Sequence, residues 1–152
     1  MFLEKICIKK FRNIDEANLE LNQKTNVIIG ENAAGKTSFL EAIDVLSRGR
    51  SFRTNKTENL IKDGENQLYV GAYEGTNKKK LEIEKAKKKT KILINNKEEA
   101  KQSKLAEELA IQSIHPNSHG LVEGAPSERR SFMDWGLFHV EQNFKNEWSA
   151  YT

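Results

Sequence analysis

The stretch that decides the fold is Gly30-Glu31-Asn32-Ala33-Ala34-Gly35-Lys36-Thr37, which fits the pattern G-x-x-x-x-G-K-[ST]. The glycines let bare backbone N–H groups approach phosphate oxygens. The lysine places a cation, with an expected catalytic role, against the β- and γ-phosphates, and the threonine hydroxyl is a ligand for Mg²⁺. We therefore expect ATP to bind with Mg²⁺ at residues 30–37, with Ser38 completing the segment.

The flanking residues fit this interpretation. Residues 25–29 form a short apolar run that predicts a strand buried on both faces, ending at Gly30. From Lys36 onward a helix is predicted, with Gly49 as its stop. Apolar residues recur there at three- and four-residue spacing: Phe39, Leu40, Ile43 and Leu46. The loop would thus follow a strand and open a helix, whose N-terminal dipole attracts anions.

The rest of the chain predicts an α/β fold, in which a mixed sheet surrounds the phosphate loop. Apolar and polar residues alternate near the N-terminus, which predicts two strands joined by a turn at residues 13–15. An antiparallel β subdomain is expected at about residues 68–94. Further expected elements are a short helix at 103–110, a strand at 111–114 and a helix at about 127–151 capped by Ser127. The last helix has no stop signal, so we expect 1–152 to be the front part of a longer ATPase head.

Composition narrows the class of protein. Of 152 residues, 31% are charged and 37% hydrophobic, the balance of a soluble single domain. No apolar run approaches the ~18 residues of a spanning helix, and the N-terminus lacks a secretory signal pattern. The single cysteine, Cys7, cannot form an internal disulfide. We expect a cytoplasmic protein without a membrane partner.

Basic charge is concentrated in one stretch. Residues 78–91 contain eight lysines and two glutamates, whereas the whole chain carries a net charge of only +3. Lys87, Lys88 and Lys89 are adjacent within it. Such a cluster is typical of contact with a DNA backbone, but lysines also keep an exposed strand edge from aggregating. The sequence leaves both interpretations open.

Several motifs together resemble a known family. Asn32-Ala33-Ala34-Gly35-Lys36-Thr37-Ser38 followed by Leu40-Glu41-Ala42-Ile43 resembles the phosphate loop of SMC-like ATPases, relatives of the ABC ATPases that act on DNA. Phe11-Arg12-Asn13-Ile14 is similar to their N-terminal motif. Residues 49–53 and 124–135 narrow the resemblance to the RecF family of bacterial recombination mediators. Members are about twice this length, and their signature sequence and Walker B strand have no counterpart here.

The resemblance implies a function in recombinational DNA repair and replication. Two subunits would sandwich ATP and clamp DNA as an ATP-dependent homodimer. With RecO and RecR, such a protein would help RecA load at single-strand gaps and take part in the SOS response. The complete protein would be a weak, DNA-stimulated ATPase, and the present chain alone would be inactive.

The resemblance also assigns roles to residues outside the loop. Arg12 and Asn13 would contact the nucleotide, although a solvated turn arginine is the alternative. Gln112 matches a glutamine that reaches Mg²⁺ and the attacking water, and it could equally be structural. Arg50 and Arg53 would touch phosphate or DNA, unless they are ordinary exposed loop charges.

Two other classes of protein remain as alternatives. A P-loop nucleotide kinase would need a lid and acceptor-binding arginines, and the β-rich middle argues against it. A transporter ATPase module usually has an aromatic adenine platform before the loop, where this chain has Phe11-Arg12-Asn13.

Overall fold

Strand β1 (Leu3–Phe11) lies inside the sheet that organises the first part of the chain. Ile6 and Ile8 are buried, whereas Lys5 and Lys9 are exposed. This period of two is that of a strand with one face on a core and one in water. The buried face of β1 therefore sets the side on which the helix of the phosphate loop packs.

The structure is a computed structural model that describes residues 1–114 and 124–141. The chain divides into two units, Met1–Ile111 and Gln112–Thr152. In chain order the elements of the first unit are β1, β2 (Ile14–Glu20), α1 (Lys36–Arg48), the 3₁₀ helix η1 (Thr57–Leu60), β3 (Gln67–Glu74), β4 (Lys79–Ala86), β5 (Lys89–Ile94), β6 (Lys97–Glu98) and α2 (Ser103–Glu108).

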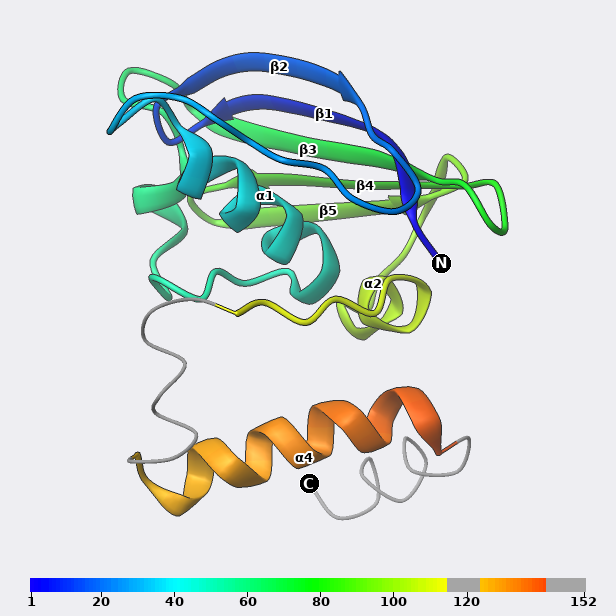
Figure 1. Ribbon diagram of the computed structural model, residues 1–152. Helices are drawn as coiled ribbons and strands as arrows, with labels where there is room; N and C mark the ends of the chain where they lie inside the picture. Colours follow the sequence, from blue (N-terminus) through cyan, green and yellow to red (C-terminus); the bar gives the residue numbers. More distant parts are fainter. Residues whose placement is uncertain (115–123, 142–152) are drawn as a thin grey trace. The chain divides into compact units, whose positions relative to one another are not determined.

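The strands form one sheet in the order β2-β1-β3-β4-β5-β6, and every neighbouring pair is antiparallel. Figure 1 shows α1 lying along one face of this sheet. The predicted α/β fold with strands between residues 68 and 94 is confirmed, but within the described residues the sheet is antiparallel throughout and not mixed as expected. Those strands are continuous with β1 and β2, because β3 pairs with β1 from Lys9↔Tyr69 to Leu3↔Glu74.

The apolar run at residues 25–29 is not a strand, and that prediction is wrong. The exposed fractions of Val27, Ile28 and Ile29 are 77%, 38% and 88%. A strand buried on both faces needs neighbours on each side, and none of the strands within 1–114 and 124–141 pairs with this run. It is an exposed segment that leads into the phosphate loop.

Helix α1 and the sheet enclose the core between them. The helix begins after Gly35 and ends at Gly49, whose φ of 64° lies in the left-handed region that terminates helices. Its buried apolar side chains include Phe39, Val45 and Leu46, but Leu40 is 53% exposed, so the predicted apolar face is wrong at that position. The fully buried residues of the strands and of η1 that share the core with this helix include Ile8, Phe11, Leu60, Leu68, Val70, Leu81 and Ile83.

The second unit contains α4 (Pro126–Val140). Its N-cap is Ala125 and Pro126 is its first residue, not Ser127 as predicted, because proline has a fixed φ and no N–H to leave unpaired. Glu141 caps the C-terminus, and the predicted continuation through residues 142–151 lies outside the described residues. The predicted strand at 111–114 is absent, and Ile114 is 88% exposed.

None of the helices in the described parts of the chain is long and apolar enough to span a membrane.

Glu74 at the end of β3 provides a test of the fold. Its carboxylate is only 1% exposed and accepts the backbone N–H groups of Thr76 and Asn77, each at 2.7 Å. Burial raises the pKa of this carboxyl, but its hydrogen bonds, first those from the backbone N–H groups of Asn77 and Thr76, together outweigh burial, so the pKa lies below its ordinary value of 4.5. The carboxylate therefore stabilises the turn after β3 when it is ionised.

We expect Glu74→Gln to lower the free energy of unfolding by about 2 kcal/mol, because Thr76 and Asn77 donate to different carboxylate oxygens and glutamine replaces one of these acceptors with an NH2 donor. A carboxyl whose folded pKa is depressed contributes stability above its unfolded pKa and loses it as the pH falls through the folded value. The stability of the wild type should therefore fall below pH 4.5 more steeply than that of Glu74→Gln. Urea unfolding at pH 7 and pH 3, with the exposed Glu98→Gln as a control, measures both effects. Equal acid dependence of wild type and Glu74→Gln would contradict the assignment.

Candidate phosphate-binding site

The loop between residues 30 and 35 is open to solvent and has a strained backbone. Residues 30–34 are exposed, and the backbone turns into α1 at Gly35, where φ is 98°. Ala33 also has a positive φ, 66°, which costs a residue with a side chain about 1–2 kcal/mol. Strain of this kind persists where the surroundings hold it, and it is concentrated at ligand-binding loops.

Lys36 folds back over the loop. Its Nζ donates to the carbonyl oxygens of Gly30 at 2.8 Å and Glu31 at 2.7 Å. The ammonium of the first helical residue thus spans the loop and joins its end to its beginning. This arrangement places a cation among exposed backbone groups, where a phosphate would bind.

The N-terminus of α1 completes the positive environment. No side chain caps it, and its first turn contains no acidic residue. The unpaired N–H groups and the helix dipole therefore favour an anion at this end. Thr37 is exposed at the second position of the helix, where its hydroxyl is available to a metal ion bound with phosphates.

Asn13, from the turn between β1 and β2, holds the loop from the side. Its Nδ2 donates to the carbonyl of Ala33 at 2.8 Å, and its Oδ1 accepts from the Ser38 hydroxyl at 2.8 Å. A Cβ on Gly35 would lie 3.3 Å from the Asn13 amide nitrogen, so the glycine also makes room for this contact. The structure therefore places the predicted residue Asn13 against the loop.

Arg12 pairs with Glu41, a residue to which the sequence assigned no role. Its Nε and a terminal nitrogen donate to Glu41 in α1 at 3.0 and 2.7 Å. The Glu41 side chain is fully buried, whereas that of Arg12 is 22% exposed. The signal in the sequence that could have indicated Glu41 is an acidic residue within the apolar pattern of the helix. The predicted contact of Arg12 with nucleotide stays a prediction.

The residues after α1 meet the same carboxylate. Ser51 donates its hydroxyl to Glu41 Oε1 at 2.5 Å, and Arg53 donates to Oε2 at 3.4 Å. Arg50 is exposed. The structure therefore brings Arg53 together with Arg12 around one buried acid.

The lysine-rich stretch separates into two kinds of lysine. Lys87, Lys88 and Lys89 are exposed around the turn between β4 and β5. Lys85 is only 8% exposed and donates to the carbonyl of Gly49, at the C-terminus of α1, at 2.5 Å. Burial lowers the pKa of Lys85. This contact places the end of β4 beside the residue that precedes Arg50.

Gln112 belongs to the second unit, Gln112–Thr152. Its side chain is exposed and donates to the carbonyl of Ser113 at 3.3 Å. Its predicted roles toward Mg²⁺ and water stay predictions.

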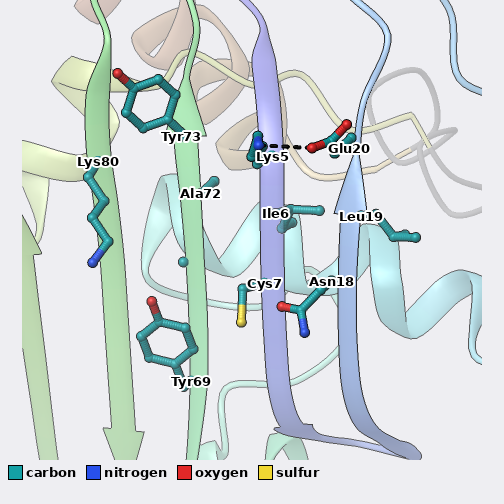
Figure 2. Close-up of a pocket in the computed structure, with 11 residues that line it drawn as sticks. Lys5, Ile6, Cys7, Asn18, Leu19, Glu20, Tyr69, Ala72, Tyr73 and Lys80 are labelled. Carbon is teal, nitrogen blue, oxygen red and sulfur yellow. Dashed lines mark ion pairs between the residues drawn. The ribbon is translucent and has the colours of Figure 1, made fainter.

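A separate hollow of about 450 Å³ lies on the sheet. Figure 2 shows Tyr69 and Tyr73 on one strand, Cys7 between them on the next, and the Lys5–Glu20 ion pair beside them. That ion pair measures 2.8 Å. None of the predicted site residues lines this hollow, so it is distinct from the phosphate loop.

Comparison with known proteins places the chain in a family. The family model described as the RecF/RecN/SMC N terminal domain matches residues 2–120. The chain is 40% identical over 155 residues to the DNA replication and repair protein RecF of Pseudoalteromonas translucida (strain TAC 125), a match that covers 100% of this chain and 43% of the relative.

Solved structures also resemble this chain in fold. The structure of the recombination mediator protein RecF-ATP in the RecFOR pathway superposes with a TM-score of 0.88 at 28% identity, covering 99% of this chain and 42% of that one. A structure from work on ATP-driven dimerization and DNA stimulated activation of SMC ATPases shares the fold, with a TM-score of 0.67 at 17% identity; the match covers 89% of this chain and 99% of that one.

The chain thus spans less than half the length of its RecF relatives. The family model covers most of the chain and includes both the loop and the Arg12–Asn13 turn. The chain belongs to the RecF/RecN/SMC N-terminal domain family.

Proposed function

We propose that this chain binds ATP with Mg²⁺ through residues 30–38 and forms the nucleotide-binding part of a RecF-type protein of recombinational DNA repair and replication. The observation that carries the proposal is the arrangement of Lys36 over the carbonyls of Gly30 and Glu31, in front of the uncapped N-terminus of α1. Bare N–H groups, a helix dipole and an ammonium together suit the β- and γ-phosphates of a nucleotide.

Mg²⁺ would be held mainly by the nucleotide. This ion keeps several waters and needs few protein ligands when phosphates supply oxygens. The exposed hydroxyl of Thr37 is a ligand that the described residues offer beside the loop. When bound, the ion would neutralise charge on the phosphates.

The relatives support a wider role. A relative carries the name DNA replication and repair protein RecF, and a similar structure is described within the RecFOR pathway. We therefore propose that the complete protein is a cytoplasmic, ATP-dependent homodimer that clamps DNA at gaps, works with RecO and RecR, helps RecA load and takes part in the SOS response.

Titration calorimetry of this chain with ATP, in the presence and absence of Mg²⁺, tests the nucleotide part of the proposal. We expect saturable binding with one ATP per chain that is tighter with Mg²⁺. An absence of heat at millimolar ATP would contradict it.

DNA contact is proposed at the exposed lysines of the β4–β5 turn. The Lys85–Gly49 hydrogen bond joins the end of β4 to the residue before Arg50, which supports the proposal that Arg50 and residues 87–89 share one basic surface. We expect weak DNA binding that is indifferent to sequence, with a log–log salt slope of about −3, because each neutralised phosphate of duplex DNA contributes about 0.9.

Changing Lys87, Lys88 and Lys89 together to Gln should flatten this slope by about 2–3 units, since each lost phosphate contact removes about one unit. ATP binding should be unaffected. The matched control changes three other exposed lysines, Lys78, Lys97 and Lys101, to Gln. Lys78 precedes β4 and Lys97 follows β5, so both lie at the end of these two strands that is opposite to the β4–β5 turn. Fluorescence anisotropy at several salt concentrations measures the slopes. An equal change of slope in both triple variants would mean that Lys87, Lys88 and Lys89 only keep a strand edge solvated and do not contact DNA.

A further inference from the structure

Glu41 is a buried acid without an assigned role. Its side chain is fully buried in α1, yet it lies one turn beyond the phosphate loop. A buried carboxylate is costly unless it is paired and hydrogen-bonded. Here both oxygens are used, by two nitrogens of Arg12, by the hydroxyl of Ser51 and, at 3.4 Å, by Arg53.

The partner of Glu41 has an unusual backbone. The φ of Arg12 is 54°, in the left-handed region that residues with side chains seldom adopt. Two contacts hold it there: the paired guanidinium, and its backbone N–H, which donates to the carbonyl of Leu60 at 2.8 Å. A conformation that is unfavourable by itself is thus maintained by its surroundings.

The next residue along the chain, Asn13, contacts the loop. It binds the carbonyl of Ala33 and the hydroxyl of Ser38, and Ala33 also has a positive φ. Since Arg12 and Asn13 form the same tight turn, the position of one determines the position of the other. A continuous series of contacts therefore runs from Glu41 through this turn to the loop.

We propose that Glu41 is a positioning residue of the nucleotide site: it fixes the Arg12–Asn13 turn so that Asn13 holds the phosphate loop in the shape that binds ATP. This rests on the proposed function. Glu41 touches no nucleotide; it acts by keeping the binding-competent loop populated. A loop that is competent only part of the time binds with an affinity reduced by that fraction.

The test is a double-mutant cycle with a fluorescent ATP analogue, mant-ATP, and this whole chain. We expect Glu41→Gln to raise the dissociation constant about tenfold, as a tenfold smaller competent population would. In an Asn13→Ala background the same change should have less than about a twofold effect, because the step through which Glu41 acts has already been removed. A purely structural acid would weaken binding equally in both backgrounds, and that result would overturn the proposal.

Asp44→Asn is the matched control. Asp44 is another buried carboxylate of α1, 2% exposed, and it pairs with Arg48 toward the end of the helix. We expect this variant to lose thermal stability like Glu41→Gln but to keep its affinity for mant-ATP. If both variants lose affinity to the same extent, general damage to the helix explains the result and the proposal is wrong.

Ser51→Ala is the variant that tests the proposal if Glu41→Gln does not fold. It removes the hydrogen bond to Glu41, together with those that the Ser51 hydroxyl accepts from the backbone of Arg53 and Thr54, without leaving a charge unpaired. It should raise the dissociation constant about threefold in the wild type and not in Asn13→Ala. Unchanged affinity in Ser51→Ala would then overturn the proposal. If the wild type does not bind mant-ATP at all, the proposed function fails, and the positioning role fails with it. If the wild type binds and Glu41→Gln binds equally well, only the positioning role fails.

Discussion

Replacing Lys36 with alanine is expected to abolish binding of Mg-ATP to this chain at concentrations that saturate the wild type. The substitution removes the cation of the loop and also the two hydrogen bonds that join its ends. Charge-assisted hydrogen bonds contribute up to about 3 kcal/mol, which corresponds to about 100-fold weaker binding. Loss of the contacts between Lys36 and the loop carbonyls would add to this effect.

The domain itself should stay folded in Lys36→Ala, because the Lys36 side chain lies at the surface of the loop and outside the core. Titration calorimetry measures the affinity, and circular dichroism checks the fold. Lys24→Ala is the control, since Lys24 is an exposed lysine shortly before the loop. Wild-type affinity in a folded Lys36→Ala variant would mean that the phosphates bind elsewhere.

The second large effect is expected in the core. Leu46→Ala should lower the free energy of unfolding by about 2–5 kcal/mol, since a large buried side chain is lost and a cavity remains. Leu46 is fully buried between α1 and the sheet. A loss of this size is a large part of the stability of an ordinary domain, about 5–15 kcal/mol.

Leu40→Ala makes the same chemical change on the same helix at a site that is 53% exposed. It should cost about 0.5 kcal/mol or less. Urea unfolding followed by circular dichroism compares the two variants at equal concentration. Similar losses in both would mean that the two leucines are equally buried, contrary to the structure.

The sequence predicted those elements whose signals are local. Gly35, Lys36 and Gly49 mark the two ends of α1, because a helix after a phosphate loop and a glycine stop each depend on neighbouring residues. The middle strands were also predictable, since alternation and turn residues such as Asn95 are read within a few positions. Helix α1 and the middle strands agree with the sequence-based expectation for this reason.

What could not be predicted depends on partners distant in the chain. The run at residues 25–29 has the composition of a buried strand, but burial depends on neighbouring strands, and none of those described supplies it. The Glu41–Arg12 pair joins residues 29 positions apart. Lys85 looks like Lys87 in sequence, and only the approach of Gly49 makes it a buried cation.

The exposed run before the loop affects how the protein behaves in solution. Val27, Ile28 and Ile29 combine high β-propensity with no charge, and Val27 and Ile29 show most of their surface to water. Such segments are sites of self-association, because an exposed apolar segment of high β-propensity can pair as a strand with an identical segment of another molecule. Since this run continues directly into Gly30, aggregation would tether the loop at its first residue. A charged substitution such as Val27→Lys would act as a gatekeeper against aggregation while leaving the phosphate loop itself unaltered.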